Sequence, residues 1–174
     1  VVFGRDDPDP SIDTTAFPSP PPDYFWSSSP YVGSGGGAWF VEFGLGSSYF
    51  DPTSGANRVR CVRSSGAAVA SSGSGGTPPG RYTFPASGTV YDTRTNLTWQ
   101  QVAPTAPVAI GCSGSTCSQA GAIAYCSGLS LGGMTTGWRL PSVRELLTLV
   151  DPTRSNPSID LTAFPSALAG AFWS

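Results

Sequence analysis

The chain has 174 residues, which suits one ordinary domain or one domain with part of another. Only 11% of the residues are charged, the formal net charge is -2, and all nine basic residues are arginine. This composition excludes the clustered positive surface that nucleic acid or an anionic membrane requires, and the absence of histidine excludes His-dependent triads and zinc sites.

The chain opens with its one acidic cluster, which follows Arg5. The cluster consists of Asp6, Asp7, Asp9 and Asp13. Carboxylates at this spacing could bind Ca²⁺. In the second copy of the repeat described next, however, Thr153, Arg154 and Asn156 replace the first three aspartates. The prediction is therefore a solvated loop, with no metal and no cofactor.

Residues 10–27 and 157–174 are two copies of one sequence. PSIDTTAFPSPPPDYFWS and PSIDLTAFPSALAGAFWS agree at 12 of 18 positions without a gap, which chance does not produce. The first copy runs on into further predicted strands, whereas the second ends the chain. Residues 1–63 are thus predicted to be the C-terminal half of one repeat unit, and residues 81–174 the N-terminal half of the next.

Between these halves, residues 64–80 have the composition of a flexible linker rich in glycine, serine and proline. Two interpretations of the split unit stay open. The chain is a window of a longer tandem-repeat protein, or each half is completed by the matching half of another copy. The second interpretation gives open, head-to-tail assembly, and the two are compatible if the parent protein is a polymer.

Residues 38–43, 47–51 and 57–63 are predicted to be short strands separated by glycine-rich turns. In the third, the alternation NRVRCVR places Val59 and Cys61 on one face and Arg58 and Arg60 on the opposite face.

Residues 81–102 alternate polar with aromatic or β-branched residues around a turn-like segment at 92–96, which predicts a β-hairpin. Residues 118–129 then predict a helix with one buried face, ended by the turn at Gly132-Gly133. The residues at helical spacing on that face are Ala122, Ile123, Cys126 and Leu129.

The clearest local signal is PSVRELLTLVD at residues 141–151. Ser142 and Glu145 have the spacing of a capping box. In this motif the serine hydroxyl accepts a hydrogen bond from a backbone N–H of the first turn, and the glutamate carboxylate accepts one from the backbone N–H of the serine. Pro152 is expected to stop the helix. Its apolar stripe is predicted to be Leu146, Leu147, Leu149 and Val150.

Four cysteines are an even number compatible with two disulfides and an oxidising compartment. Three connectivities are possible, and the sequence does not choose among them. Cys112 and Cys117 are near enough in the chain to close a small loop, which would leave Cys61 with Cys126. No stretch approaches the roughly 20 apolar residues needed to cross a bilayer, so no membrane insertion is expected.

Several of these motifs together resemble one family. YDTRTNLTWQQ, AIAYCSGLSLGG, GWRLPSVRELLTLVD, PSID with TAFP, FWSSSPY, AWFVEFG and VRCVR are similar to the Lcl C-terminal domain family, the domain at the C-terminus of Legionella collagen-like protein. In the family's order, the second half of this chain precedes the first. The resemblance implies a bacterial secreted or surface module, and it implies that Cys61 pairs with Cys126.

The WRLP element with its helix also looks like the corresponding piece of the Fibrobacter major paralogous domain and of the formylglycine-generating-enzyme group. The expected fold is therefore α+β and C-type-lectin-like, with two helices, short antiparallel strands, long loops and stabilising disulfides. The tripeptide motifs of calcium-dependent lectins do not occur, and the active-site cysteines of the formylglycine-generating enzymes cannot be matched, so only the scaffold carries over.

For the tryptophans and for Arg139, a structural role is a stronger interpretation than a functional one. The five tryptophans could line a sugar platform, but packing in the core is the stronger prediction. They are Trp26, Trp39, Trp99, Trp138 and Trp173. Arg139 is expected to pair with a carboxylate such as Glu145 or Asp151, because a desolvated guanidinium needs a partner. No catalytic residue is predicted, since the serines lack a histidine or lysine to activate them.

These observations favour a non-enzymatic structural repeat of a secreted bacterial surface protein, which assembles head-to-tail with copies of itself into a fibre or appendage. The alternative is an extracellular adhesin module that binds glycan or matrix, and it predicts an exposed aromatic or acidic cluster in residues 28–37 or 104–118. A third hypothesis, an unusual hydrolase, requires a polar pocket with perturbed carboxylates.

Overall fold

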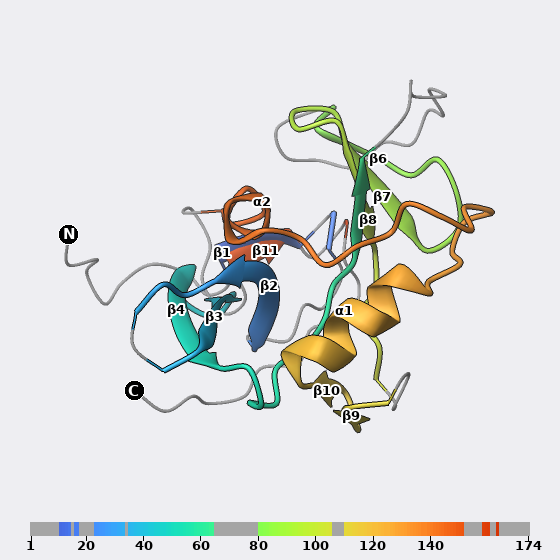
Figure 1. The fold of residues 1–174 in the computed structure, drawn as a ribbon. Helices are drawn as coiled ribbons and strands as arrows, with labels where there is room; N and C mark the ends of the chain where they lie inside the picture. The colour runs from blue at the N-terminus through green and yellow to red at the C-terminus, as the bar shows by residue number, and fades with distance from the viewer. Residues whose placement is uncertain are drawn as a thin grey trace.

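The computed structural model describes residues 11–14, 16–17, 23–33, 35–64, 80–105, 110–151, 158–160 and 163. Within these ranges the chain forms short strands in small, mostly antiparallel sheets and two short helices, joined by long loops (Figure 1). The predicted α+β class is confirmed, and two disulfides stabilise the domain.

The first sheet is antiparallel with the order β2-β3-β4. Its strands are β2 at Tyr24–Pro30, β3 at Gly37–Glu42 and β4 at Ser47–Pro52. β3 and β4 are the strands predicted at residues 38–43 and 47–51. The strand predicted at 57–63 is regular only at its end, as β5 at Val62–Ser64, because residues 57 and 58 are held by isolated bridges to Cys117 and Phe25.

The second sheet has the order β5-β8-β7-β6 and is antiparallel throughout. The hairpin predicted from residues 81–102 is confirmed as β7 at Thr89–Asp92 and β8 at Leu97–Gln100, flanked by β6 at Tyr82–Thr83. Asn96 closes its turn with a φ of 56°, a left-handed conformation that asparagine tolerates better than most residues. The fourth strand, β5, comes from the other side of the linker.

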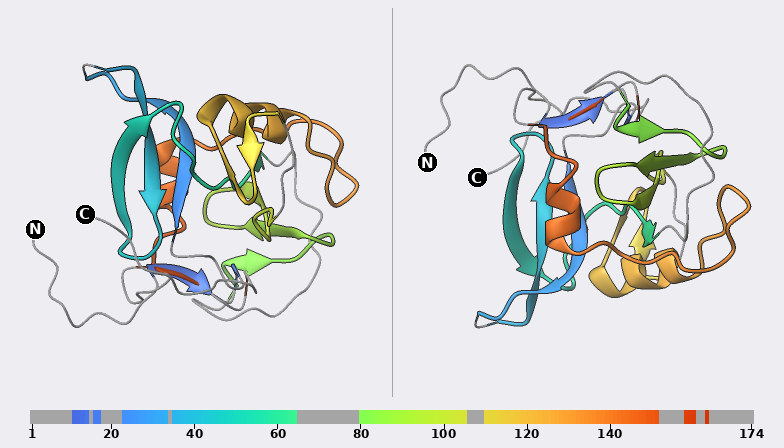
Figure 2. Two further views of the ribbon diagram at one scale, coloured as in Figure 1. Left: turned by 90° about the horizontal axis from the view of Figure 1, so that it is seen from below. Right: turned by 90° about the horizontal axis from the view of Figure 1, so that it is seen from above.

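Two smaller pairs complete the sheet structure. β9 at Cys112–Ser113 and β10 at Thr116–Cys117 form a tight antiparallel pair. β1 at Ser11–Thr14 and β11 at Ser158–Asp160 form a parallel pair. Figure 2 shows the β1·β11 pair across one end of the molecule, opposite the end that carries α1.

Helix α1 at Gln119–Ser127 begins at the N-cap Ser118 and buries Gly121, Ala122 and Cys126. The prediction that Ile123 shares the buried face is wrong, because this side chain is 46% exposed. The physical reason is the close approach of Gly121 to Gly111, where an added Cβ would lie 2.8 Å from the carbonyl oxygen of Gly111. This contact sets the rotation of the helix and turns Ile123 outward.

Helix α2 at Val143–Leu147 begins at Ser142 with the predicted capping box and packs against β2 and β3. It ends well before Pro152, contrary to expectation. The N–H groups of Leu149 and Val150 instead bond the carbonyls of Leu146 and Leu147, which tightens the chain until Val150 bridges β1. Leu147 is consequently left 38% exposed, outside the predicted apolar stripe.

Two hydrophobic clusters form the core, and each contains residues from both sides of the linker. The first lies around Phe17, Phe25, Val62, Trp99 and Leu146. The second surrounds Trp26, Val59, Trp138 and the Cys61–Cys126 disulfide. Among the described residues no helix is long and apolar enough to span a membrane.

The two disulfides should contribute unequally to stability because they close loops of different length. Cys61–Cys126 spans 65 residues and Cys112–Cys117 spans five. Loop-closure entropy predicts a loss of about 4 kcal/mol for the variant C61S/C126S and about 2 kcal/mol for C112S/C117S. Urea unfolding of both variants under identical conditions measures the difference, and an equal or reversed order would contradict the entropic account.

Candidate functional site

The candidate site is the seam along which residues 11–64 dock on residues 80–163. At its centre β5 is inserted between two segments of the second part of the chain. Val62 pairs with Trp99 of β8 on one side. On the other side its N–H donates to the Arg139 carbonyl at 3.0 Å, and the Arg139 N–H donates back at 2.8 Å. The first part therefore supplies a strand that the second part lacks.

β2 makes a second line of hydrogen bonds across the seam. The Trp26 indole Nε1 donates to the Cys117 carbonyl at 2.8 Å. The Ser28 N–H donates to the Pro141 carbonyl at 2.7 Å, and the Val143 N–H donates to Ser29 Oγ at 3.1 Å.

Trp26 is fully buried, as is Trp99, and Trp138 is nearly so. These three tryptophans pack in the core as predicted. Trp39 is only partly buried, contrary to the prediction, and Trp173 lies outside the described residues.

The disulfide Cys61–Cys126 makes the seam covalent. Around it, the Gln100 N–H donates to the Cys61 carbonyl at 2.9 Å, and the Cys61 N–H donates to Gln100 Oε1 at 3.2 Å. The other disulfide, Cys112–Cys117, joins β9 to β10 within the second part of the chain. Both pairings are those suggested by chain spacing, and the first is the one implied by the family resemblance.

Arg60 is a buried cation in the seam that the sequence pattern did not reveal. The residue is 1% exposed, and its Nη1 donates to the carbonyls of Gln100 and Gln101 at 2.9 and 2.6 Å. Its guanidinium carbon lies 5.0 Å from the ring centre of Phe17 and 5.4 Å from that of Phe25. Alternation places Arg60 opposite Val59 and Cys61, but both faces of the segment are covered. Burial lowers the pKa of Arg60 to about 9.

Arg139 pairs with Glu145, one of its two predicted partners, but its side chain is 44% exposed and not desolvated as expected. Nη1 and Nη2 of Arg139 donate to the two carboxylate oxygens of Glu145 at 2.8 and 2.6 Å. The same carboxylate accepts the Ser142 N–H at 2.7 Å and so completes the capping box. The hydrogen bonds from Arg139, reinforced by those from Ser142, lower the pKa of Glu145 to about 2.

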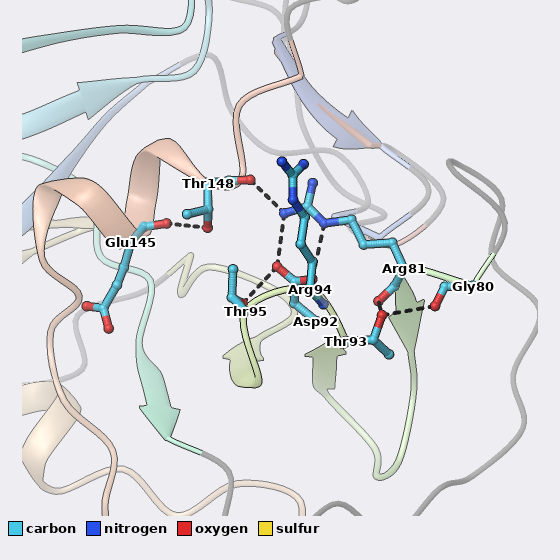
Figure 3. A network of polar contacts seen from close by, with 8 residues as sticks. All are labelled: Gly80, Arg81, Asp92, Thr93, Arg94, Thr95, Glu145 and Thr148. Carbon is cyan, nitrogen blue, oxygen red and sulfur yellow. Dashed lines mark hydrogen bonds and ion pairs between the residues drawn. The ribbon is translucent and has the colours of Figure 1, made fainter.

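A second polar network, which the sequence did not indicate, joins the β6-β7 hairpin to the end of α2 (Figure 3). Arg81 makes a bidentate ion pair with the buried Asp92 at 3.1 and 2.9 Å, and its Nη2 also donates to the Thr148 carbonyl at 2.6 Å. Asp92 further accepts hydrogen bonds from the Arg94 N–H and the Thr95 hydroxyl. The Asp92 carboxylate thus holds the turn after β7 and, through Arg81, the end of α2.

The two copies of the repeated sequence meet at one end of the seam. β1 and β11 belong to the two copies and pair in parallel, with Asp13 opposite Ile159 and Thr14 opposite Asp160. The equivalent alanines, Ala16 and Ala163, are both fully buried in the first hydrophobic cluster. Of the predicted acidic cluster, residues 6–9 lie outside the described residues.

One partly exposed aromatic cluster lies away from the seam, where β3 and β4 meet the loop after β2. Tyr31 stacks face to face on Phe50 with ring centres 3.7 Å apart, and Trp39 meets both rings edge-on. Phe50 and its neighbour Tyr49 are 49% and 59% exposed. Within the described ranges no group of three or more His, Cys, Asp or Glu residues could hold a metal ion.

The model of the Lcl C-terminal domain family matches two stretches of the chain, residues 2–63 and 88–174. The matched stretches lie on both sides of the seam and leave out residues 64–87, which contain the predicted linker and the short strand β6. No curated protein and no solved structure gave a significant match.

Replacing Arg60 by methionine should destabilise the fold. The substitution keeps an unbranched, flexible apolar stem but removes the donor to two carbonyls and the cation beside two rings, so we expect a loss of about 2 to 3 kcal/mol in urea unfolding. The exposed Arg144 offers a matched control, and R144M should change stability by less than about 0.5 kcal/mol. An R60M variant at least as stable as the parent would show that burial of the cation outweighs its contacts.

Glu145 should make stability depend on acid pH. Its folded-state pKa lies below the ordinary value of 4.5, so its stabilising effect is present above about pH 4.5 and is lost as the pH falls toward 2. Because both partners are partly exposed, we expect this contribution to be about 1 kcal/mol. Unfolding free energies of the parent and E145Q, compared at pH 5.5 and pH 2.5, isolate it, and an unchanged difference between the two pH values would contradict the assignment.

Proposed function

The chain belongs to the Lcl C-terminal domain family, and from this premise we propose that it is a non-enzymatic structural module of a bacterial surface protein. The module assembles head-to-tail with copies of itself into a fibre or appendage. The observation that carries the proposal is the insertion of β5 between β8 and Arg139, because it makes each part of the chain incomplete without the other.

The seam supports this proposal through the groups that it covers. Without Val62–Ser64, the backbone groups of β8 and of Arg139 that face β5 would lose their partners. Both hydrophobic clusters would also open, since each draws residues from both sides of residues 64–80. A matching part from another copy offers the same strand and the same apolar side chains. Assembly between chains therefore needs no contact that differs from those within one chain.

The chemistry of the chain supports a structural role over a catalytic one. The carboxylates Asp23, Asp92 and Glu145 each form an ion pair with an arginine. The low charge reduces repulsion between stacked copies. Two disulfides suit an extracellular location at the cell surface. The combination of two helices, small antiparallel sheets and long loops is compatible with the C-type-lectin-like class, which we retain as the proposed fold group.

The aromatic cluster favours a second candidate function, an adhesin module that binds glycan or extracellular matrix. Tyr31 lies in the range 28–37, where this alternative requires an exposed cluster. A sugar stacks on the flat face of an aromatic ring. Tyr31 and Phe50, however, cover one face of each other, and Trp39 presents its ring edge-on to both. The cluster thus offers fewer free ring faces than its size suggests.

We expect the purified chain to form filaments as its concentration rises. Analytical ultracentrifugation should show a growing series of multiples of 17.9 kDa, and electron microscopy should show regular linear particles. Denaturing gels without reductant should return a single band near 17.9 kDa if the Cys61–Cys126 disulfide stays within each chain. They should show a ladder if the parts on the two sides of the seam are exchanged between chains, because this disulfide crosses the seam.

The adhesin alternative makes different predictions for the same material. A particle that stays monomeric at every concentration would overturn the proposed assembly. If that monomer also binds a glycan array, and W39A abolishes the binding, the adhesin function replaces it. The matched control for W39A is Y125A, which alters a partly buried aromatic residue of α1 away from the cluster.

A further inference from the structure

The two copies of the repeated sequence are neighbours in space as well as duplicates in sequence. β1 and β11 carry the same tripeptide, Ser-Ile-Asp, and run parallel, with a shift of one residue at Ser11. Nothing in the chemistry of this pair requires its two strands to come from the same chain. β1 would meet the same backbone partner in β11 of any other copy.

Among the described contacts, β1 is held by more neighbours than β11. Ile12 of β1 is fully buried and bridges Val150. Among the described contacts, β11 is held by its short pairing with β1, and nearby the Gln101 side chain donates to the Ala163 carbonyl at 2.9 Å. A strand of three residues that is held mainly by one neighbouring strand is a segment of low local stability.

We propose that β11 of one chain docks on β1 of the next chain, so that the β1·β11 pair is the joint between consecutive copies in the assembly. The partner is a second copy of this chain, and the docked segment contains β11 at Ser158–Asp160 and Ala163. The inference rests on the proposed head-to-tail assembly and identifies the element that links one subunit to the next.

The disulfides explain why β11, and not β5, makes the joint. Cys61 lies next to β5 and is bonded to Cys126 of α1, so the disulfide fixes the inserted strand within its own chain. The four cysteines of the chain are used in Cys61–Cys126 and Cys112–Cys117, so β11 carries no such restraint. A folded, oxidised chain can thus exchange β11 while its seam stays closed.

The open form keeps the contacts of the closed form. Ala163 fills the hydrophobic cluster that contains Ile12 and Ala16, so a domain that has released its own segment offers a site that the next chain's segment fits. Such an exchange costs little, because each joint replaces an identical one. A row of chains then has one unfilled β1 at one end and one undocked β11 at the other, which are the sites of growth.

The length of the connection limits which copies can be joined. Seven peptide steps separate Asp151 from Ser158, a reach of at most about 25 Å. A domain of this length has a radius of gyration of about 16 Å. Its diameter is at least twice this radius and therefore exceeds the reach of the connection. β11 can reach a touching neighbour but cannot pass over one, which favours a single-file arrangement.

Cysteine pairs placed across the joint test the proposal in the full chain. Ser11 and Ser158 are register partners, and serine to cysteine is a nearly isosteric change. The two variants S11C and S158C are mixed under assembly conditions and treated with a short bis-maleimide, which finds no other free thiol because all four native cysteines are in disulfides. We expect a covalent heterodimer at least several-fold above the level obtained with S11C and S130C, whose cysteine at the exposed Ser130 lies away from the joint.

The other outcomes separate this inference from the proposed assembly. Filaments that yield no S11C–S158C heterodimer, while the double variant S11C/S158C cross-links only within one chain, would overturn the joint and leave head-to-tail assembly standing. A chain that neither assembles nor cross-links between copies would overturn both. Should either variant fold poorly, T14C and D160C probe the same pairing three residues along β1.

Discussion

The structure depends on a single strand crossing from one part of the chain to the other. β5 pairs with β8 on one edge and with Arg139 on its other edge, and the rest of the seam is arranged around this insertion. Cys61 immediately precedes β5, so the long-range disulfide and the strand act on the same stretch of backbone. Both hydrophobic clusters contain residues of this stretch, Val62 in the first and Cys61 in the second. The described parts of the chain on the two sides of residues 65–79 therefore complement each other.

The polar groups of the domain fix the seam and its surroundings. The few charged residues of the chain are therefore enough to hold the fold in place. Arg60 sits where a hydrophobic residue would be expected, yet its contacts with two carbonyls and two aromatic rings come from both sides of the linker. Such a cation specifies one docking geometry, since a shifted seam would leave it buried without its acceptors. Apolar burial supplies the strength of the interface, and Arg60 supplies its register.

The sequence predicted those elements whose determinants are local. The hairpin of β7 and β8 and the capping box of Ser142 and Glu145 follow from residues within a few positions of one another. Ile123 and Leu147 were misplaced because their exposure depends on which distant backbone packs against the helix. Arg60 escaped notice for the same reason: alternation separates two faces but does not say whether both are covered. The repeat was visible in the sequence, whereas the proximity of its copies was not.

If the proposed joint forms between copies, the duplicated segment sets up a competition between closed and open forms. Both forms use the same β1·β11 contacts, so neither gains from better contacts, and the balance depends on how strongly each strand is concentrated near its partner. Within a chain, the short connection after Asp151 keeps β11 close to its own β1. Between chains, only a high density of copies can match that effective concentration. Crowding of exported subunits at a surface would provide it, and dilution would return the chain to the closed form.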